Sequence, residues 1–160
     1  GGTYPAFMNI LLGIIKAKAI GKGSYLDISM YENLIPLAWL GIGHFFHKGI
    51  SPKSNSLGLN GGSARYNIYI TKDKKYLALG ALEDKFWINF CNLINAPSDV
   101  KYEKLENEML KLEIQKIIRK KNSSFWKNKF EKEENVCCTL IKNIGEFMND
   151  PHIKKKKNFF

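Results

Sequence analysis

Glu83 is the residue whose position in this sequence most directly suggests a chemical role. It lies in the stretch YLALGALEDKFW, where an apolar strand pattern ends and an amphipathic helix pattern begins. A carboxylate at such a junction can take part in acid–base chemistry. An acidic residue there also interacts favourably with the helix dipole, a contribution of about 0.3–1 kcal/mol. The residues alone leave the functional and the purely structural interpretation of Glu83 open.

His44 and His47 form a second candidate group, because they are three residues apart in the helical pattern GHFFHKG. Such a pair can ligate a metal, but neither a carboxylate nor a third histidine stands near it in the sequence. We therefore expect solvated or core-edge histidines. The stretch GKGSY lacks the spacing of a phosphate-binding loop, and the sequence contains no GxSxG or HExxH motif.

The three cysteines, Cys91, Cys137 and Cys138, show no CxxC spacing and no accompanying histidine cluster. They predict neither a disulfide framework nor a metal site, and a reducing compartment is the simplest interpretation. The sequence has no run of 18 apolar residues and no signal-peptide pattern. We expect a soluble, cytoplasmic protein without a membrane span.

Composition places the chain among globular proteins, because 44% of its 160 residues are hydrophobic. Its formal net charge of +10 raises the question of nucleic-acid binding through phosphate contacts. The 25 basic residues include only two arginines, Arg65 and Arg119, whereas phosphate and groove recognition favours the arginine fork. We expect a solvated, lysine-rich surface and no nucleic-acid partner.

The elements that must position these residues begin with two helical patterns. Helical spacing of apolar residues predicts a long, mostly buried helix over residues 4–19, ended by the glycines of GKG. The alternation in SYLDISM predicts a short strand at residues 24–30. Residues 31–49 are apolar almost all round and predict a packed helix, with Pro36 near its first turn or at a kink. Residues 51–63 are rich in Ser, Gly and Asn and predict an irregular loop.

The second half of the chain combines strand and helix patterns. Two alternating runs in residues 64–82, joined by Lys-Asp-Lys-Lys, predict an antiparallel hairpin, and an amphipathic helix follows. A polar linker is expected at residues 95–100, followed by helices at 105–120 and at 123–132, the second with Ser123 as a cap. The remaining expected elements are a strand in NVCCTLI, a last helix stopped by Pro151, and a charged turn or tail at 154–157. The sum is an α+β fold, in which long helices accompany a small antiparallel sheet domain.

Several stretches of the sequence resemble one known superfamily. In chain order they are GGTYPAFMNILLGII, GKGSYLDISMYENL, LNGGSARYNIYITKDKKYLALGALEDKFW, CCTLI and NDPHIKKKKNFF. Together they resemble the family III CoA-transferase (CaiB/BaiF-like) superfamily over nearly the whole chain. GGSARYNIY followed by GALE is similar to its alpha-methylacyl-CoA racemase branch, because the longer glycine run ending in glutamine that is typical of formyl-CoA-type transferases is absent.

The resemblance implies that the chain is an internal segment of a two-domain fold. It implies that residues 1–50 are a helical part of the large domain and a linker, 51–150 a small α+β domain, and 151–160 a return segment toward the large domain. It places a catalytic Asp just before Gly1, and a catalytic His and the CoA-binding portion further upstream. On this basis we expect the isolated chain to be inactive.

The resemblance also implies a reaction and roles for four residues. The reaction is racemisation of a 2-methylacyl-CoA by proton transfer through an enolate. Glu83 matches the glutamate that supports the catalytic histidine across a dimer interface, and a carboxylate on the second ring nitrogen fixes the tautomer. Tyr66, Leu59 and Met30 match positions near the acyl pocket, and ordinary core packing remains an alternative for all three, above all for Leu59 and Met30.

The implied partners are an acyl-CoA thioester as substrate and, in the full-length protein, a second copy of the same chain. The resemblance implies neither a metal nor a redox cofactor, because coenzyme A is part of the substrate. Two alternatives stay open. One is a family III CoA-transferase, in which the Asp acts as nucleophile, and the other is a non-catalytic, lysine-rich binding fragment.

Overall fold

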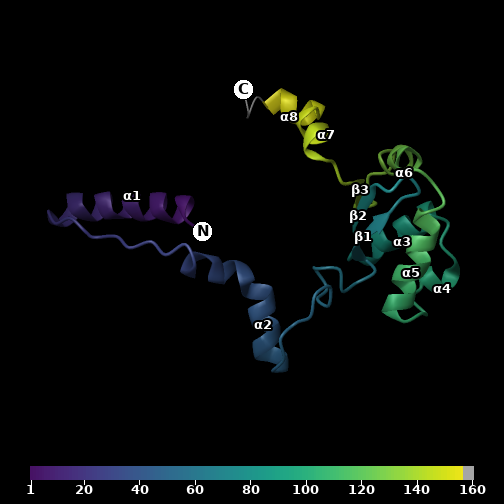
Figure 1. Ribbon diagram of the computed structural model, residues 1–160, viewed down its shortest axis with the longest axis horizontal. Coiled ribbons are helices and arrows are strands. Elements are labelled where there is room, and N and C mark those ends of the chain that lie inside the picture. The colour runs from purple at the N-terminus through teal and green to yellow at the C-terminus, as the bar shows by residue number, and fades with distance from the viewer. Residues whose placement is uncertain (157–160) are drawn as a thin grey trace. The chain divides into compact units, whose positions relative to one another are not determined.

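The computed structural model describes residues 1–156 (Figure 1). The chain divides into two compact units, residues 1–52 and residues 53–160. None of the helices within residues 1–156 is both long and apolar enough to cross a membrane. The last residues of the predicted return segment, 157–160, lie outside the described residues.

Unit 1, residues 1–52, is helical. Its elements are α1 (Thr3–Ile20), the 3-10 helix η1 (Glu32–Ala38) and α2 (Trp39–Lys48). Helix α1 ends at Gly21 with φ 70°, a left-handed conformation that costs glycine little, so the predicted glycine stop is confirmed. Pro36 lies inside η1, where its missing amide hydrogen suits an irregular turn before α2.

The strand predicted at residues 24–30 is wrong, because residues 22–29 form no regular secondary structure. Alternation alone does not make a strand, since its backbone groups need a partner strand to bond with. The described residues of unit 1 supply no such partner, and all three paired strands of the sheet belong to unit 2.

No residue of unit 1 is buried, which corrects the prediction of a mostly buried first helix. The apolar residues that recur at helical spacing in α1 keep 46–64% of their surface exposed; they are Phe7, Ile10, Leu11, Ile14 and Ile15. Their spacing correctly predicted the helix. Burial depends on a covering element, and unit 1 supplies none.

Unit 2 contains a three-stranded antiparallel sheet in the order β1–β2–β3. The strands are β1 (Tyr66–Ile70), β2 (Tyr76–Gly80) and β3 (Cys138–Leu140). Tyr66 pairs with Gly80, so that β1 and β2 form the predicted hairpin, and Leu79 pairs with Cys138. The short strand predicted in NVCCTLI is confirmed as β3.

Six helices accompany this sheet within the described part of unit 2. They are α3 (Asp84–Leu93), α4 (Ser98–Lys101), α5 (Asn107–Ile118), α6 (Ser123–Phe130), α7 (Ile144–Met148) and α8 (Pro151–Lys156). The helices predicted around α3, α5, α6 and α7 are confirmed. Helix α4 begins within the predicted polar linker, and the predicted tail at residues 154–156 is helical. Pro151 follows the end of α7 as expected, but it also begins α8, because proline suits the first turn of a helix.

The core lies on one face of the sheet, where Figure 1 shows α3, α4 and α5. Alternate strand residues such as Tyr69, Leu77 and Leu79 point into it. The aromatic and aliphatic side chains that pack against them come from three helices: Trp87, Phe90, Ile114, Ile118, Trp126 and Phe130. On the opposite face Ile68 remains 55% exposed, so that the helices cover only one side of the sheet.

The start of α6 is held by the hairpin turn and not by the predicted Ser123 cap. Ser123 is the first helical residue, after Asn122 at the N-cap, and no side chain of the N-cap bonds the helix. The amide and the hydroxyl of Ser123 donate to the Asp73 carboxylate at 2.8 and 2.6 Å. The Thr71 hydroxyl donates to the same carboxylate at 2.6 Å. Asp73 thus satisfies a free amide at the positive end of the helix dipole.

The pH dependence of folding tests this contact. Hydrogen bonds from Ser123 first, and then from Thr71, hold the pKa of Asp73 below its usual value of 3.8. A carboxylate whose pKa is lower in the folded state stabilises the fold above its unfolded pKa, and this stabilisation is lost as the pH falls. We expect the free energy of unfolding in urea to decline below about pH 4, and to decline less in Asp73→Asn.

A matched control is Asp27→Asn, because the Asp27 carboxylate has no hydrogen bond or ion pair among residues 1–156. This variant is expected to keep the wild-type pH dependence. Identical slopes for wild type and Asp73→Asn would contradict the role of the hairpin turn.

Candidate functional site

Glu83 occupies the N-cap position of α3, directly after the end of the sheet. Its backbone is extended, with φ −77° and ψ 143°, and its carbonyl accepts hydrogen bonds from the amides of Phe86 and Trp87. The side chain is exposed and makes no hydrogen bond or ion pair within the described residues. The backbone of Glu83 is therefore fixed, while its carboxylate is free to meet a partner.

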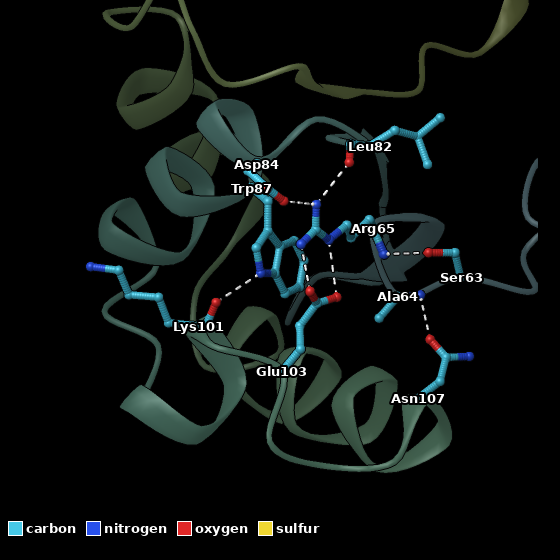
Figure 2. Close-up of polar contacts among 9 residues, drawn as sticks. All are labelled: Ser63, Ala64, Arg65, Leu82, Asp84, Trp87, Lys101, Glu103 and Asn107. Carbon is cyan, nitrogen blue, oxygen red and sulfur yellow. Dashed lines mark hydrogen bonds and ion pairs between the residues drawn. The ribbon is translucent and has the colours of Figure 1, made fainter.

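Arg65 joins the peptide on both sides of Glu83 to the rest of unit 2 (Figure 2). Its Nη1 donates to the carbonyl of Leu82 at 2.8 Å and to the carboxylate of Asp84 at 2.7 Å. Its Nε donates to Glu103 Oε1 at 3.0 Å, and Nη2 donates to the other oxygen of the same carboxylate. These contacts, which we call the Arg65 fork, connect the start of β1, the end of β2 and the turn before α5.

The fork rests on the core of the unit. The guanidinium carbon of Arg65 lies 5.3 Å from the centre of the Trp87 ring, and Trp87 is fully buried. The indole Nε1 of Trp87 donates to the carbonyl of Lys101 at 3.0 Å, which orients the ring. The hydrogen bond to Glu103 raises the pKa of Arg65 and partial burial opposes this, so the guanidinium stays charged.

The glycine-containing loop before β1 is held by Asn107, the first residue of α5. The Asn107 side chain accepts from the amide of Ala64 at 2.9 Å and donates to the carbonyl of Gly62 at 2.7 Å. The hydroxyl of Tyr69 donates to the Ala64 carbonyl at 2.7 Å. A Cβ at Gly62 would lie 2.5 Å from the backbone of Leu57, so this position needs glycine.

This loop and the open face of the sheet line a partly open cavity of about 730 Å³. Leu59 from the loop and Tyr66 from β1 both line it, so the structure brings these two predicted residues together. Ile68, Cys137 and Thr139 also line it. Glu83 is not among the lining residues, although Gly80, near the same end of β2, is.

Met30 lies in unit 1, beside the Gly1-Gly2 turn. A Cβ on Gly1 would lie 2.7 Å from the Met30 carbonyl oxygen, and one on Gly2 would lie 3.3 Å from its sulfur. Glycine therefore lets the start of α1 approach this loop closely. The Met30 side chain is 69% exposed, so it is not an ordinary core residue of unit 1.

The described residues contain no group of three or more His, Cys, Asp or Glu side chains that could hold a metal ion. The cysteine thiols are free. Burial raises the pKa of Cys91 to about 12 and also raises that of Cys138, so neither thiol ionises readily.

Sequence reasoning missed Arg65, Asp84 and Glu103. A signal for Arg65 was present, because arginine is rare in this lysine-rich chain and one of its two arginines stands between the glycine loop and a strand. No sequence pattern indicated Glu103, since it lies 38 residues away in a turn with φ 51°.

The family model of CoA-transferase family III matches residues 1–160. The chain belongs to CoA-transferase family III. Its curated relatives include the alpha-methylacyl-CoA racemase of Homo sapiens, 23% identical over 99% of this chain. A CaiB/baiF CoA-transferase family protein of Caenorhabditis elegans is 30% identical over 91% of it. The chain spans 42% of the length of each of these two relatives.

Two crystal structures of Rv3272 from Mycobacterium tuberculosis resemble this family III chain over 92% of its length. Their TM-scores are 0.69 and 0.66, at 14% and 15% identity, and the match covers 39% and 40% of those chains. The likeness shows a shared fold. It confirms the prediction of an α+β segment that is part of the family III fold.

Proposed function

We propose that this chain is a segment of a 2-methylacyl-CoA racemase that moves a proton at C2 through an enolate. The observation that carries the proposal is the exposed carboxylate of Glu83, which has no hydrogen bond or ion pair among residues 1–156 and stands on a backbone fixed from both sides. The alpha-methylacyl-CoA racemases of Homo sapiens and Mus musculus, 23% and 24% identical to the chain, support this branch of the family.

In the proposed reaction one base removes the C2 proton and an acid returns a proton to the opposite face. The electron pair of the broken C–H bond moves into the thioester carbonyl, and the new C–H bond takes it back. The acid and the base are the His and the Asp that the family resemblance places upstream of residue 1. No net oxidation occurs, because one proton leaves and one returns.

The role proposed for Glu83 is to bind the second ring nitrogen of that histidine. A carboxylate there fixes the tautomer and stabilises the charged imidazole when it holds the substrate proton. The family resemblance suggests a homodimer, in which Glu83 contacts the histidine of the other copy. An exposed carboxylate with no partner in the described part of its unit suits such a contact.

The cavity beside the glycine loop is proposed as part of the acyl-binding pocket. Leu59, Tyr66 and Ile68 give it an apolar lining, which suits a branched hydrocarbon chain. Met30, in unit 1, is proposed on the family resemblance alone to be a substrate-binding residue, because a flexible side chain suits a variable apolar chain.

Incorporation of deuterium tests the reaction. A 2-methylacyl-CoA incubated in heavy water with the proposed full-length enzyme is expected to gain deuterium at C2 without any acceptor acid, as mass spectrometry will show. A CoA-transferase instead forms a covalent enzyme intermediate and shows ping-pong kinetics. Exchange of CoA that requires an acceptor, with no deuterium at C2, would overturn the racemase proposal in favour of the transferase.

Glu83→Gln tests the supporting role in the same protein. It removes the charge but keeps the shape, so we expect kcat for deuterium incorporation to fall about 10- to 100-fold with an unchanged melting temperature. The matched control is Glu106→Gln, because Glu106 is also an exposed N-cap glutamate without a side-chain cap bond. The control should keep wild-type turnover. Wild-type turnover in Glu83→Gln would leave Glu83 with only a helix-dipole role.

A further inference from the structure

We propose that Arg65 is a positioning residue, which sets the direction of the Glu83 carboxylate by holding the residues on either side of it. The inference rests on the proposed function, because it needs Glu83 to act on a histidine. Its basis is that one nitrogen, Nη1, bonds both the Leu82 carbonyl and the Asp84 carboxylate. Arg65 thereby fixes the backbone of Glu83, which lies between them, without a hydrogen bond to Glu83 itself.

The chemistry of the fork requires arginine. Four acceptor atoms converge on the guanidinium from three directions: the Leu82 carbonyl, one oxygen of Asp84 and both oxygens of Glu103. A planar guanidinium presents five N–H groups in a fixed geometry and reaches all four. A lysine ammonium is a compact charge on a flexible stem, and it cannot bond the three groups in this arrangement.

Packing against Trp87 also immobilises the Arg65 fork. The Arg65 side chain is only 17% exposed and lies over the buried Trp87 ring. Trp87 in turn bonds the Lys101 carbonyl, and its amide bonds the Glu83 carbonyl. The peptide of residues 82–84 is thus held at both ends by Arg65 and in the middle by α3.

As a consequence, the Glu83 carboxylate loses little conformational freedom when it binds the proposed histidine. Because the backbone of Glu83 is fixed, only its side-chain torsions remain free when it meets the imidazole. Ordering a backbone residue costs conformational entropy, so a junction ordered in advance makes the contact more favourable. We therefore expect loss of the fork to reduce turnover through Glu83 and not through the fold.

A double-mutant cycle tests this in the proposed full-length enzyme. We expect Arg65→Lys to lower kcat for C2 deuterium incorporation about 5- to 10-fold with little change in KM. In the Glu83→Gln background the same substitution is expected to change kcat less than about twofold, because the carboxylate that it positions is already gone. An equal fold-loss in both backgrounds would show a merely structural role and would overturn the proposal.

The matched control is Arg119→Lys, which changes the other arginine at an exposed position without an ion pair among residues 1–156. It is expected to leave kcat and KM at their wild-type values. Arg65→Met gives a second test of the fork, because it keeps the hydrophobic stem over Trp87 and removes every donor. Its loss of kcat should be at least as large as that of Arg65→Lys, and a smaller loss would contradict the need for donors.

Amide hydrogen exchange separates this inference from the proposed function. In Arg65→Lys the amides of Phe86 and Trp87, which bond the Glu83 carbonyl, should exchange faster, whereas those of residues 76–80 in β2 should not change. If the wild type incorporates no deuterium at C2, the racemase proposal fails, and exchange alone then decides whether Arg65 holds the junction. Unchanged exchange at Phe86 and Trp87 would overturn the positioning role, whatever the reaction.

Discussion

The packing of the Arg65 guanidinium over the buried ring of Trp87 is the interaction on which the candidate site depends. Through its hydrogen bonds the Arg65 side chain connects a loop, the end of the sheet and the start of α3 (Figure 2). The ion pairs of Arg65 contribute little to stability where the partner side chain is exposed. The Asp84 side chain is 87% exposed, and pairs of this kind contribute about 0–1 kcal/mol. The main effect of the fork is therefore on geometry: it fixes the backbone around Glu83.

The two faces of the sheet have different surroundings. The core packs against one face, where helices α3, α5 and α6 bury large aromatic side chains. The other face and the loop with Gly62 border the partly open cavity lined by Leu59 and Tyr66. Because Asn107 bonds both sides of Ser63, the helix layer also holds the loop over the open face. The cavity and the junction at Glu83 thus depend on the same small core.

Sequence patterns correctly predicted the elements that depend mainly on interactions between residues close together in the sequence. The hairpin, the loop before it, α3 and the glycine end of α1 follow from alternation, helical spacing and turn residues. The incorrect predictions concern features that depend on residues far away in the sequence. The stretch 24–30 alternates but has no strand to pair with, and α1 is apolar but is not covered within unit 1. Glu83 could be selected as a candidate because a strand-to-helix junction is visible in the sequence. Arg65 was missed because its acceptors are 17 to 38 residues away.

We propose that the exposed carboxylate of Glu83 orients a catalytic histidine. A crystal structure of the proposed full-length enzyme with an acyl-CoA analogue tests it most directly, through the distance from the Glu83 carboxylate to the nearest imidazole nitrogen. We expect a hydrogen bond of about 2.6–3.2 Å, with the Arg65 fork intact beside it and the other ring nitrogen facing C2 of the ligand. An intact fork with no imidazole within reach of Glu83 would show that Glu83 does not orient the histidine.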